Sequence, residues 1–410
     1  MKLAPVFCRI CQNTPTFLCL PLGAQPPANQ FLTKKQLSQP EPSFPLNTHV
    51  CLECGLIQVP NFIPPNFFRQ YVYMPSVSQM LRNHFSGFAQ LLTKEYRKSG
   101  DDLIVDIGSN DGLFLKACLD RGARVLGIEP SQNLTTIARE KGVEVVNQYF
   151  NFDTAQDALK KYGPASIITS TNTFNHIDDL HGFMKGIEVL LDPQGVFVVE
   201  VPHSLDLVKE NQFDTIYHEH LSEFSVRSLV QLYKHGNLEI FDLKELPIHG
   251  GSMRVFAQKK TGPHPKNPIV SEWLKEENEA GLFQRETYER FSERVYQNKT
   301  EMMVLLNKLK SEGKTLAGYG APAKGSTLLN FYGIGSDLLD FLADRNPLKQ
   351  GLYSPGSHIL VVDPKEIEKK KPDYLLILAW NFADEIMQEQ AAFKNQGGKF
   401  IIPIPSLRII

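Results

Sequence analysis

The sequence has no excess of charge of either sign. Its 410 residues carry 43 Lys plus Arg against 45 Asp plus Glu, for a net charge of -2 at pH 7. A basic surface is the usual footprint of proteins that bind nucleic acid or an anionic membrane, so neither partner is expected. Apolar runs such as Tyr374 to Trp380 are too short to cross a bilayer, and polar residues interrupt the N-terminal stretch where a signal peptide would need an apolar core. We therefore expect a cytoplasmic protein of two or three domains with reduced cysteines.

Cysteine is scarce but regularly spaced. Four of the six cysteines form two Cys-x-x-Cys pairs, Cys8 with Cys11 and Cys51 with Cys54, which together supply four thiolates for one tetrahedral zinc ion. The proline-rich segment between the pairs is predicted to be a loop. Because no polar side chain suited to catalysis lies beside the pairs, we interpret the zinc as structural. The other two cysteines are expected to be buried free thiols.

The sequence also lacks the Gly-x-Gly-x-x-Gly turn typical of dinucleotide-binding domains. The apolar strand predicted over 103–107 runs instead into a turn with two glycines and then a helix. A second predicted strand ends at Glu129, about 20 residues further on, where a carboxylate can bond the hydroxyls of a ribose. This turn resembles motif I of the class I S-adenosylmethionine methyltransferases, which implies a doubly wound α/β sheet. The cofactor-binding residues implied by the resemblance are Asp106, Gly108, Asn110, Gly112, Glu129 and Asn172.

Further strands and helices fit the same plan. Apolar runs bounded by turn residues predict strands, and apolar residues at helical spacing predict helices. The turn His249-Gly250-Gly251 predicts an antiparallel hairpin at the end of the sheet. Beyond Pro263, a charged segment with helical periodicity predicts a connecting helix or helix pair. Strands are predicted over 124–128, 166–170, 196–201, 238–246 and 252–258, and helices over 80–96, 113–121, 180–191, 221–236 and 269–310.

Side chains suited to acid–base chemistry are concentrated in the segment Tyr217-His218-Glu219-His220. Imidazole titrates near neutrality, so a histidine beside a glutamate near the end of a strand is typical of a general base. A solvated polar turn and a metal pair formed by the two histidines are the alternatives that the residues leave open. His176 follows another predicted strand, and the carboxyl ends of parallel strands share one edge, so we expect His176 in the same pocket.

Two alternating tyrosines, Tyr71 and Tyr73, lie on an extended segment before the first predicted helix. Alternate residues of such a segment point to the same side, so both could line a pocket. Aromatic packing between domains is the alternative.

A second αβ unit is predicted from Lys314 onwards. Its first strand leads into Gly318-Tyr319-Gly320-Ala321-Pro322-Ala323-Lys324, where backbone N–H groups at a helix start and a lysine charge suit a phosphate. The turn is not a Walker A loop, and a purely structural turn is the alternative. Further strands are predicted over 338–343, 358–362 and 374–379.

Together these motifs resemble the sugar C-methyltransferases over nearly the whole chain. That family acts on nucleotide-linked 4-keto-deoxysugars in pathways to branched sugars, with S-adenosylmethionine and structural zinc as cofactors. The motifs that carry the resemblance are the two cysteine pairs, 105–112, 217–222, 249–252, 318–325 and 346–351. The resemblance implies a zinc-binding domain over 1–70, an S-adenosylmethionine-binding methyltransferase domain over 71–262, a helical connector over 263–312, and a Rossmann-like nucleotide-sugar-binding domain over 313–410.

The resemblance also implies roles for individual residues. His220 is the expected base that removes the C3 proton, which the C4 ketone makes acidic, and Glu219 orients or polarises it. Tyr217, His176 and either Tyr71 or Tyr73 are the expected donors to the O4 oxyanion or the sugar hydroxyls. The expected substrate-binding residues are His218, His249, Lys324, Asn330 and Lys349.

The chain departs from the family pattern at two positions. Glu223 stands where an aromatic residue is expected, and Pro322 deviates in the phosphate turn. Either change could alter which sugar or nucleotide is accepted.

Two other functions fit parts of the sequence. A sugar O- or N-methyltransferase could use the same base without exchanging the C3 proton, and a non-catalytic, zinc-stabilised binding protein would transfer no methyl group. The sequence leaves open whether the nucleotide is TDP or GDP, which deoxysugar is used, the stereochemistry at the methylated carbon, and the oligomeric state.

Overall fold

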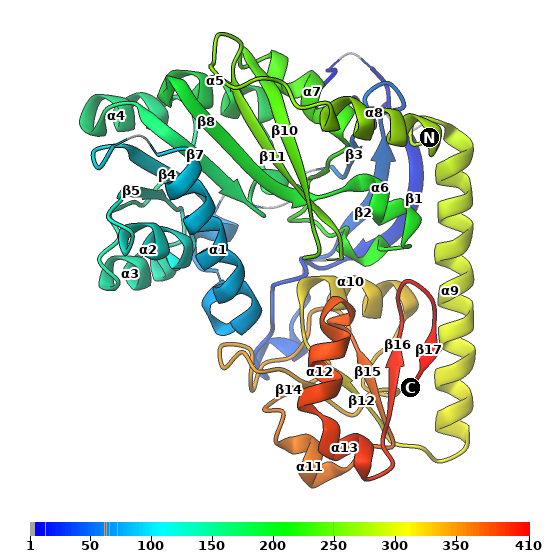
Figure 1. Ribbon diagram of the computed structural model, residues 1–410. Coiled ribbons are helices and arrows are strands. Elements are labelled where there is room, and N and C mark those ends of the chain that lie inside the picture. Colours follow the sequence, from blue (N-terminus) through cyan, green and yellow to red (C-terminus); the bar gives the residue numbers. More distant parts are fainter. Residues whose placement is uncertain are drawn as a thin grey trace.

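The computed structural model describes residues 5–12, 14–60, 62, 64, 66–71, 73–97, 99–248 and 250–410. These residues form three sheets, and one long helix runs beside two of them (Figure 1). His249 lies outside the described residues.

The first sheet has four strands in the order β1-β2-β3-β9. β1 (Phe17–Gln25) and β2 (Phe44–Val50) form an antiparallel hairpin, β3 (Ile57–Gln58) follows, and β9 (Ser222–Glu223) comes from the middle of the chain. We predicted a loop for the whole segment between the cysteine pairs. This prediction is wrong for its two ends, which form β1 and β2. Irregular pairing around Pro21 accommodates a residue without an N–H, and the inward side chains of both strands join a large apolar core.

The second sheet has seven strands in the order β10-β11-β8-β7-β4-β5-β6. β11 runs in the opposite direction to the other six strands of this sheet. The chain reverses its direction of growth between β4 and β7, and the carboxyl ends of strands at such a switch point are where doubly wound sheets bind ligands. The predicted doubly wound sheet is confirmed. Its strands are β4 (Leu103–Ile107), β5 (Arg124–Ile128), β6 (Val145–Val146), β7 (Ala165–Thr171), β8 (Leu191–Pro202), β10 (Leu238–Leu246) and β11 (Ser252–Lys259).

Helices cover both faces of this sheet. One apolar core joins the sheet to the first three helices, and another joins its opposite face to α4, α5 and α7 (Figure 1). The two cysteines outside the zinc pairs, Cys19 and Cys118, are buried free thiols, as predicted. The helices are α1 (Gln79–Glu95), α2 (Leu113–Leu119), α3 (Gln132–Glu140), α4 (Phe152–Tyr162), α5 (Leu180–Leu190), α6 (Ser204–Lys209) and α7 (Val226–Lys234).

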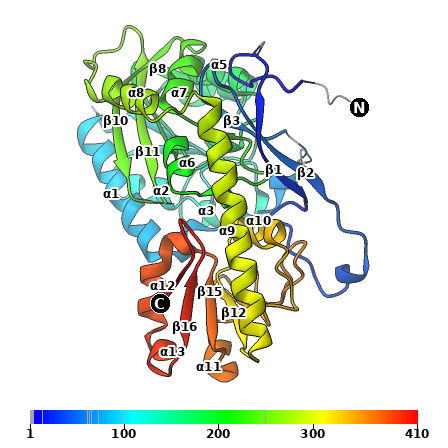
Figure 2. The same ribbon diagram turned by 90° about the vertical axis from the view of Figure 1, so that its right-hand side faces the viewer.

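A helix pair, α8 (Ile269–Glu279) and α9 (Arg285–Ser311), leads to the third sheet, as predicted. α9 runs past both the N-terminal sheet and the C-terminal domain (Figure 2), and its buried face joins a core shared by both. No helix in the described parts of the chain is both long and apolar enough to cross a membrane.

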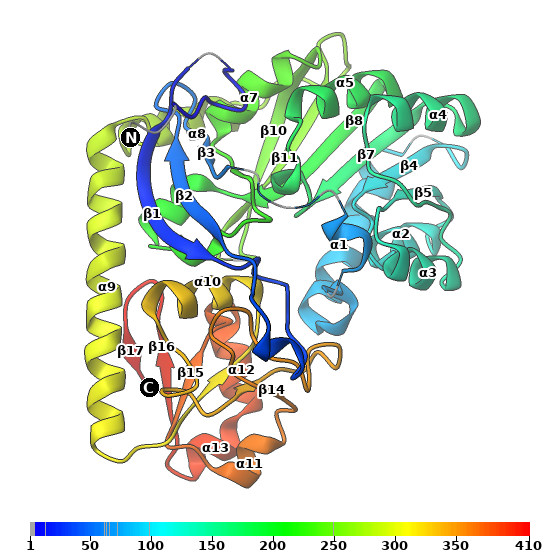
Figure 3. The ribbon, with the colours of Figure 1, turned by 180° about the vertical axis from the view of Figure 1, so that it is seen from behind.

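The third sheet has the order β14-β13-β12-β15-β16-β17 and is parallel except at β17. It is the smaller Rossmann-like unit expected at the C-terminus. The loop between β1 and β2 reaches over this domain (Figure 3), where Leu32 pairs with Tyr353. The elements are β12 (Leu316–Tyr319), β13 (Leu342–Ala343), β14 (Val361–Val362), β15 (Tyr374–Ile377), β16 (Lys399–Ile402), β17 (Arg408–Ile409), α10 (Ala323–Tyr332), α11 (Glu366–Lys370), α12 (Ala383–Glu389) and α13 (Ala391–Asn395).

Several predicted boundaries are wrong. The helix expected over 221–236 begins at Val226, because Ser222 and Glu223 pair with β3 and Ser225 caps the helix. Of the strands expected over 338–343 and 358–362, only the last two residues of each are β-strand in the structure. Of the strand expected over 374–379, only the first four residues are. Tertiary pairing outweighs local propensity in these short segments.

Candidate active site

The segment 217–220 is a tight turn between two fixed elements. It follows a short 3₁₀ helix (Phe213–Thr215) and leads into β9 of the N-terminal sheet. The His220 N–H donates to the Tyr217 carbonyl (2.9 Å), which closes the turn. Thr327 of α10 donates its hydroxyl to the Ile216 carbonyl (3.1 Å), so the C-terminal domain holds the turn from a third side.

The His220 imidazole has a partner on each ring nitrogen. Nε2 hydrogen-bonds the Tyr217 hydroxyl, and Nδ1 lies 3.0 Å from Oε1 of Glu223. The His176 ring packs edge-on against the imidazole, with a centroid distance of 5.0 Å. Burial lowers the pKa of His220 to about 3, and the positive charge of Lys324 acts in the same direction. The resting imidazole is therefore neutral, and burial disfavours its protonation.

Glu219 is held by the loop between β1 and β2. Its Oε1 accepts from the backbone N–H (3.1 Å) and the side-chain amide (3.2 Å) of Asn29, and its Oε2 is buried without a partner in the described structure. Burial raises the pKa of Glu219 to about 7. No contact supports the predicted role of Glu219 in orienting His220, because the carboxylate beside the imidazole is that of Glu223.

The two candidate tyrosines separate in the structure. The Tyr71 hydroxyl accepts from the side-chain amide of Asn29 (3.4 Å), the same amide that binds Glu219. Burial raises the pKa of Tyr71 well above its usual value, so the phenol remains a hydrogen-bond donor. Tyr73 is 40% exposed, and its carbonyl accepts from Nδ2 of Asn110 in the predicted cofactor turn (3.1 Å). Tyr71 therefore lies in the same group of side chains as His220, Tyr217, Glu219, Glu223 and His176, which we call the His220 cluster. Tyr73 instead contacts the predicted cofactor turn.

The turn after β4 has the close-packed geometry expected of a cofactor site. Gly108 has φ +75°, and a Cβ there would lie 2.2 Å from the Thr173 hydroxyl, so only glycine fits. Glu129, at the end of β5, accepts the N–H of Asn110 (2.9 Å) and of Ser131 (2.8 Å). These hydrogen bonds fix the carboxylate beside the turn and leave further lone pairs for a ribose.

The other predicted cofactor residues lie around the same strand ends. Asp106 is buried, accepts from the Thr169 hydroxyl (2.6 Å), and has its pKa raised to about 7 by burial. Gly112 and Asn172 both adopt positive φ, the first at the start of α2 and the second just after β7. All six predicted residues thus gather at the carboxyl ends of β4, β5 and β7, around the switch point.

Lys324 lies at the start of α10 and faces the central domain. Its ammonium hydrogen-bonds Oδ1 of Asn381 and lies 3.9 Å from the Trp380 ring centroid. Trp380 in turn donates to Oδ2 of Asp214 (2.8 Å), which precedes the turn 217–220. Burial lowers the pKa of Lys324 to about 8, opposed by the charge of Asp214. Lys324 therefore lies where the predicted phosphate-binding turn, residues 318–324, meets the His220 cluster.

The other described residues predicted to bind substrate, Lys349, His218 and Asn330, make different contacts. Lys349 donates to the Ala321 carbonyl in the phosphate turn (2.8 Å). His218 hydrogen-bonds the Phe44 carbonyl (3.1 Å), so its Nε2 is directed at β2. Asn330 lies two turns along α10 and donates to the Pro355 carbonyl (3.1 Å). Lys349 therefore reaches the turn that precedes Lys324, and Asn330 is held in another contact. His218 also lines the cavity that includes His176 and Glu219.

The four predicted zinc ligands converge. Their sulfur atoms all lie within 4.8 Å of one another, and the Cys8–Cys54 separation is 3.7 Å. A zinc–sulfur bond of about 2.3 Å in a tetrahedron places sulfurs about 3.8 Å apart, so the cluster fits zinc. Its four thiolates leave no position for a reactant, as in structural sites.

Three residues of this region were missed by sequence reasoning. Glu223 was noticed only as a departure from a family pattern. Asn29 lies in the segment predicted to be a loop without chemistry, and Asp214 lies in a segment to which no function was assigned. Only their tertiary contacts reveal them.

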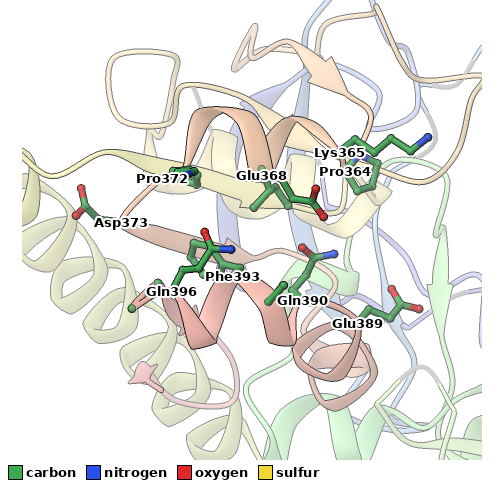
Figure 4. Close-up of a pocket in the computed structure, with 14 residues that line it drawn as sticks. Pro364, Lys365, Glu368, Pro372, Asp373, Glu389, Gln390, Phe393 and Gln396 are labelled. Atoms are coloured by element: carbon green, nitrogen blue, oxygen red, sulfur yellow. The ribbon is translucent and has the colours of Figure 1, made fainter.

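Two cavities differ in their relation to this cluster. One of about 220 Å³ borders it and is lined by His176 and Glu219, among others. Another of about 280 Å³ lies between α11 and α13 (Figure 4). Two residues lining the second, Asp373 and Gly398, immediately precede β15 and β16, so it lies at the amino ends of those strands. That edge is opposite to the one where doubly wound sheets bind ligands.

Comparison with known families divides the chain into three matched parts. Residues 8–68 match a zinc binding domain, residues 78–243 a methyltransferase domain, and residues 247–405 the family described as "C-methyltransferase C-terminal domain".

Comparison with individual proteins gives one relative of similar length. C-methyltransferase NovU of Streptomyces niveus is 36% identical over 404 residues, which cover 98% of this chain and 96% of NovU. The uncharacterized methyltransferase OB1106 of Oceanobacillus iheyensis is 29% identical over 136 residues, 32% of this chain and 61% of that protein. A solved S-adenosylmethionine-dependent methyltransferase of Anabaena variabilis matches 44% of this chain and 86% of its own, with 16% identity and a TM-score of 0.36. The strand order of the second sheet defines the fold of the central domain.

Proposed function

Because this chain belongs to the C-methyltransferases, enzymes that use S-adenosylmethionine, we propose that its methyl acceptor is C3 of a nucleotide-linked 4-keto-deoxysugar. One observation carries this proposal: the His220 imidazole, whose side chain is 12% exposed, lies between a phenol and a carboxylate. Carbon-bound protons are weakly acidic, and such a positioned base is needed to remove one. The resemblance of the chain to the sugar C-methyltransferases supplies the substrate class.

The residues of the cluster suit the two demands of enolate chemistry. The C4 ketone of the sugar acidifies the C3 proton, and Nε2 of His220 receives that proton. Negative charge then develops on O4, where hydrogen-bond donors stabilise it. Tyr71 and His176 are the proposed donors, joined by Tyr217 when its single proton is not directed at Nε2 of His220, and the raised pKa values of both half-buried phenols keep them protonated.

Bound S-adenosylmethionine supplies the electrophilic methyl group that C3 acquires. We place it over 106–112, with its ribose on Glu129 and its methionine end near Asn172. Asn110 donates to the carbonyl of Tyr73, and Tyr71 shares the Asn29 amide with Glu219, so these two tyrosines link the proposed cofactor site to the His220 cluster.

The test is an assay in D2O with purified protein and a TDP- or GDP-linked 4-keto-6-deoxysugar. Without S-adenosylmethionine we expect deuterium to enter at C3, seen by proton NMR. With it, we expect the product mass to rise by one methyl group on carbon. Methyl transfer to carbon without exchange at C3 would exclude the enolate mechanism, and no transfer to either sugar would exclude this substrate class.

We further propose that Lys324 and the start of α10 bind the diphosphate of the substrate. Lys324→Gln should raise KM for the nucleotide sugar on the order of 10-fold or more, because a charge-assisted hydrogen bond is lost. Cofactor affinity, measured by calorimetry, should stay unchanged.

Lys314→Gln is the matched control for Lys324. Lys314 lies at the amino end of β12 in the same domain, paired with Asp373 on the opposite edge of the sheet. Its replacement should leave KM unchanged. An unchanged KM in Lys324→Gln would remove the proposed role in binding the diphosphate.

A further inference from the structure

Glu223 departs from the residue type expected at its position and touches the proposed base. We propose that Glu223 is a positioning residue that orients His220 and allows the buried imidazole to take up a proton. This inference rests on the proposed function, in which His220 is the base. It assigns to Glu223 the role that the sequence suggested for Glu219.

The contact is geometrically well defined. Oε1 of Glu223 lies 3.0 Å from Nδ1 of His220, and Glu223 is 2% exposed. Its backbone is fixed because Glu223 pairs with Ile57 of β3. With Nδ1–H donated to this carboxylate, the imidazole is held in the tautomer whose Nε2 carries a lone pair. That nitrogen is the one that meets Tyr217.

The arrangement balances the proton transfer. The C3–H bond breaks, its electron pair forms the C3=C4 bond, and O4 becomes the enolate oxygen. The proton reaches Nε2 of His220, either directly or through the Tyr217 hydroxyl, which gives up its own proton and takes the one from C3. The resulting imidazolium is then paired with the Glu223 carboxylate, so the buried pair carries no net charge.

An isolated histidine would be a poor base at this position. Burial disfavours the imidazolium, and it also disfavours the Glu223 carboxylate, whose pKa it raises well above the usual range. Among the residues that the structure describes, the ionisable groups that face His220 are Tyr217 on its own turn, Glu223 on β9, His176 after β7 and Lys324 at the start of α10. Among them only Glu223 can place a negative charge against Nδ1. Pairing the two buried ions offsets the cost of charging either one.

Glu223→Gln tests this role because it keeps the size and removes the charge. We expect kcat to fall on the order of 10²-fold with KM for both substrates nearly unchanged. Loss of the anion lowers the pKa of His220, so the acidic limb of the kcat/KM profile should move to lower pH. Glu223→Asp, which keeps the charge but withdraws it by one methylene, should retain more activity than Glu223→Gln. Histidine-labelled NMR should show the same fall in the His220 pKa without any substrate.

Glu277→Gln is the matched control. Glu277 is another buried carboxylate bonded to a histidine, His203 (2.9 Å), and lies outside the cluster. Its replacement should leave the pH profile of kcat/KM unchanged. If Glu223→Gln keeps the wild-type kcat and pH profile while His220→Ala is inactive, the role of Glu223 is overturned and the base assignment stands. If the wild-type protein exchanges no C3 proton, the proposed function fails, and the NMR titration still decides whether Glu223 raises the pKa of His220.

Discussion

His220→Ala should abolish both C3 proton exchange and methyl transfer, with kcat lowered on the order of 10²- to 10⁴-fold. The reason is that the variant lacks the imidazole whose Nε2 meets the Tyr217 hydroxyl and whose Nδ1 faces the Glu223 carboxylate. Binding of S-adenosylmethionine should persist, because the proposed cofactor residues lie at the carboxyl ends of the central sheet. Exchange by NMR, methyl transfer by mass and cofactor affinity by calorimetry measure the three quantities separately.

His49→Ala is the control for loss of a partly buried histidine. His49 lies on β2 of the N-terminal sheet and contacts the Thr16 hydroxyl (3.2 Å). Its replacement should leave exchange and methyl transfer unchanged.

Continued exchange in His220→Ala would point to Glu219. That carboxyl is buried, has one oxygen without a partner in the described structure, and has its pKa raised to about 7 by burial. A carboxylate with such a pKa can serve as a general base near neutrality. Glu219→Gln would then abolish the remaining exchange, whereas under the present assignment it should impair catalysis less than His220→Ala.

Local patterns predicted the parts of the fold that depend on nearby residues. The spacing of Cys8, Cys11, Cys51 and Cys54 was sufficient to predict their cluster, because a metal site imposes its own geometry. The turn from Gly108 was also evident, because positive φ and close packing against Thr173 require glycine there.

The parts that failed depend on residues far apart in the chain. β1 and β2 pair across a long proline-rich segment, and β9 adds to their sheet from the centre of the sequence. No local pattern encodes such a register, which fixes the backbone of Glu223 against β3, although Glu223 and His220 themselves lie only three residues apart. Asn29 reaches Glu219 for the same reason, because the loop that carries it crosses between domains. The assignment of the carboxylate partner of His220 therefore had to wait for the tertiary structure.

Loss of zinc should disable catalysis although the metal does no chemistry. Each cysteine pair holds one point of the chain that follows the turn 217–220. Beside the first pair, Arg9 donates to the Leu221 carbonyl (2.7 Å). In the second pair, the Cys54 carbonyl accepts from the Ser225 hydroxyl (2.8 Å). Without metal, the four thiols, of which three are buried and that of Cys11 is half-buried, lose the ion that holds them together, and metal binding in such sites is coupled to folding. The pairing of β3 with β9 should loosen, and with it the position of Glu223.

Cys51→Ala, or removal of zinc with a chelator, should therefore lower kcat on the order of 10²-fold or more, the range attributed to a positioned base. Zinc content by mass spectrometry and hydrogen exchange at β3 and β9 would show whether the N-terminal sheet opens. Cys19→Ala is the control, because Cys19 is a buried thiol on the same sheet outside the metal cluster. If zinc-free protein keeps its kcat, the N-terminal sheet holds the turn 217–220 without the metal. If cofactor binding is lost together with kcat, zinc supports the whole fold. If kcat falls while cofactor binding survives, the cysteine cluster is the anchor of β9, the strand that carries Glu223.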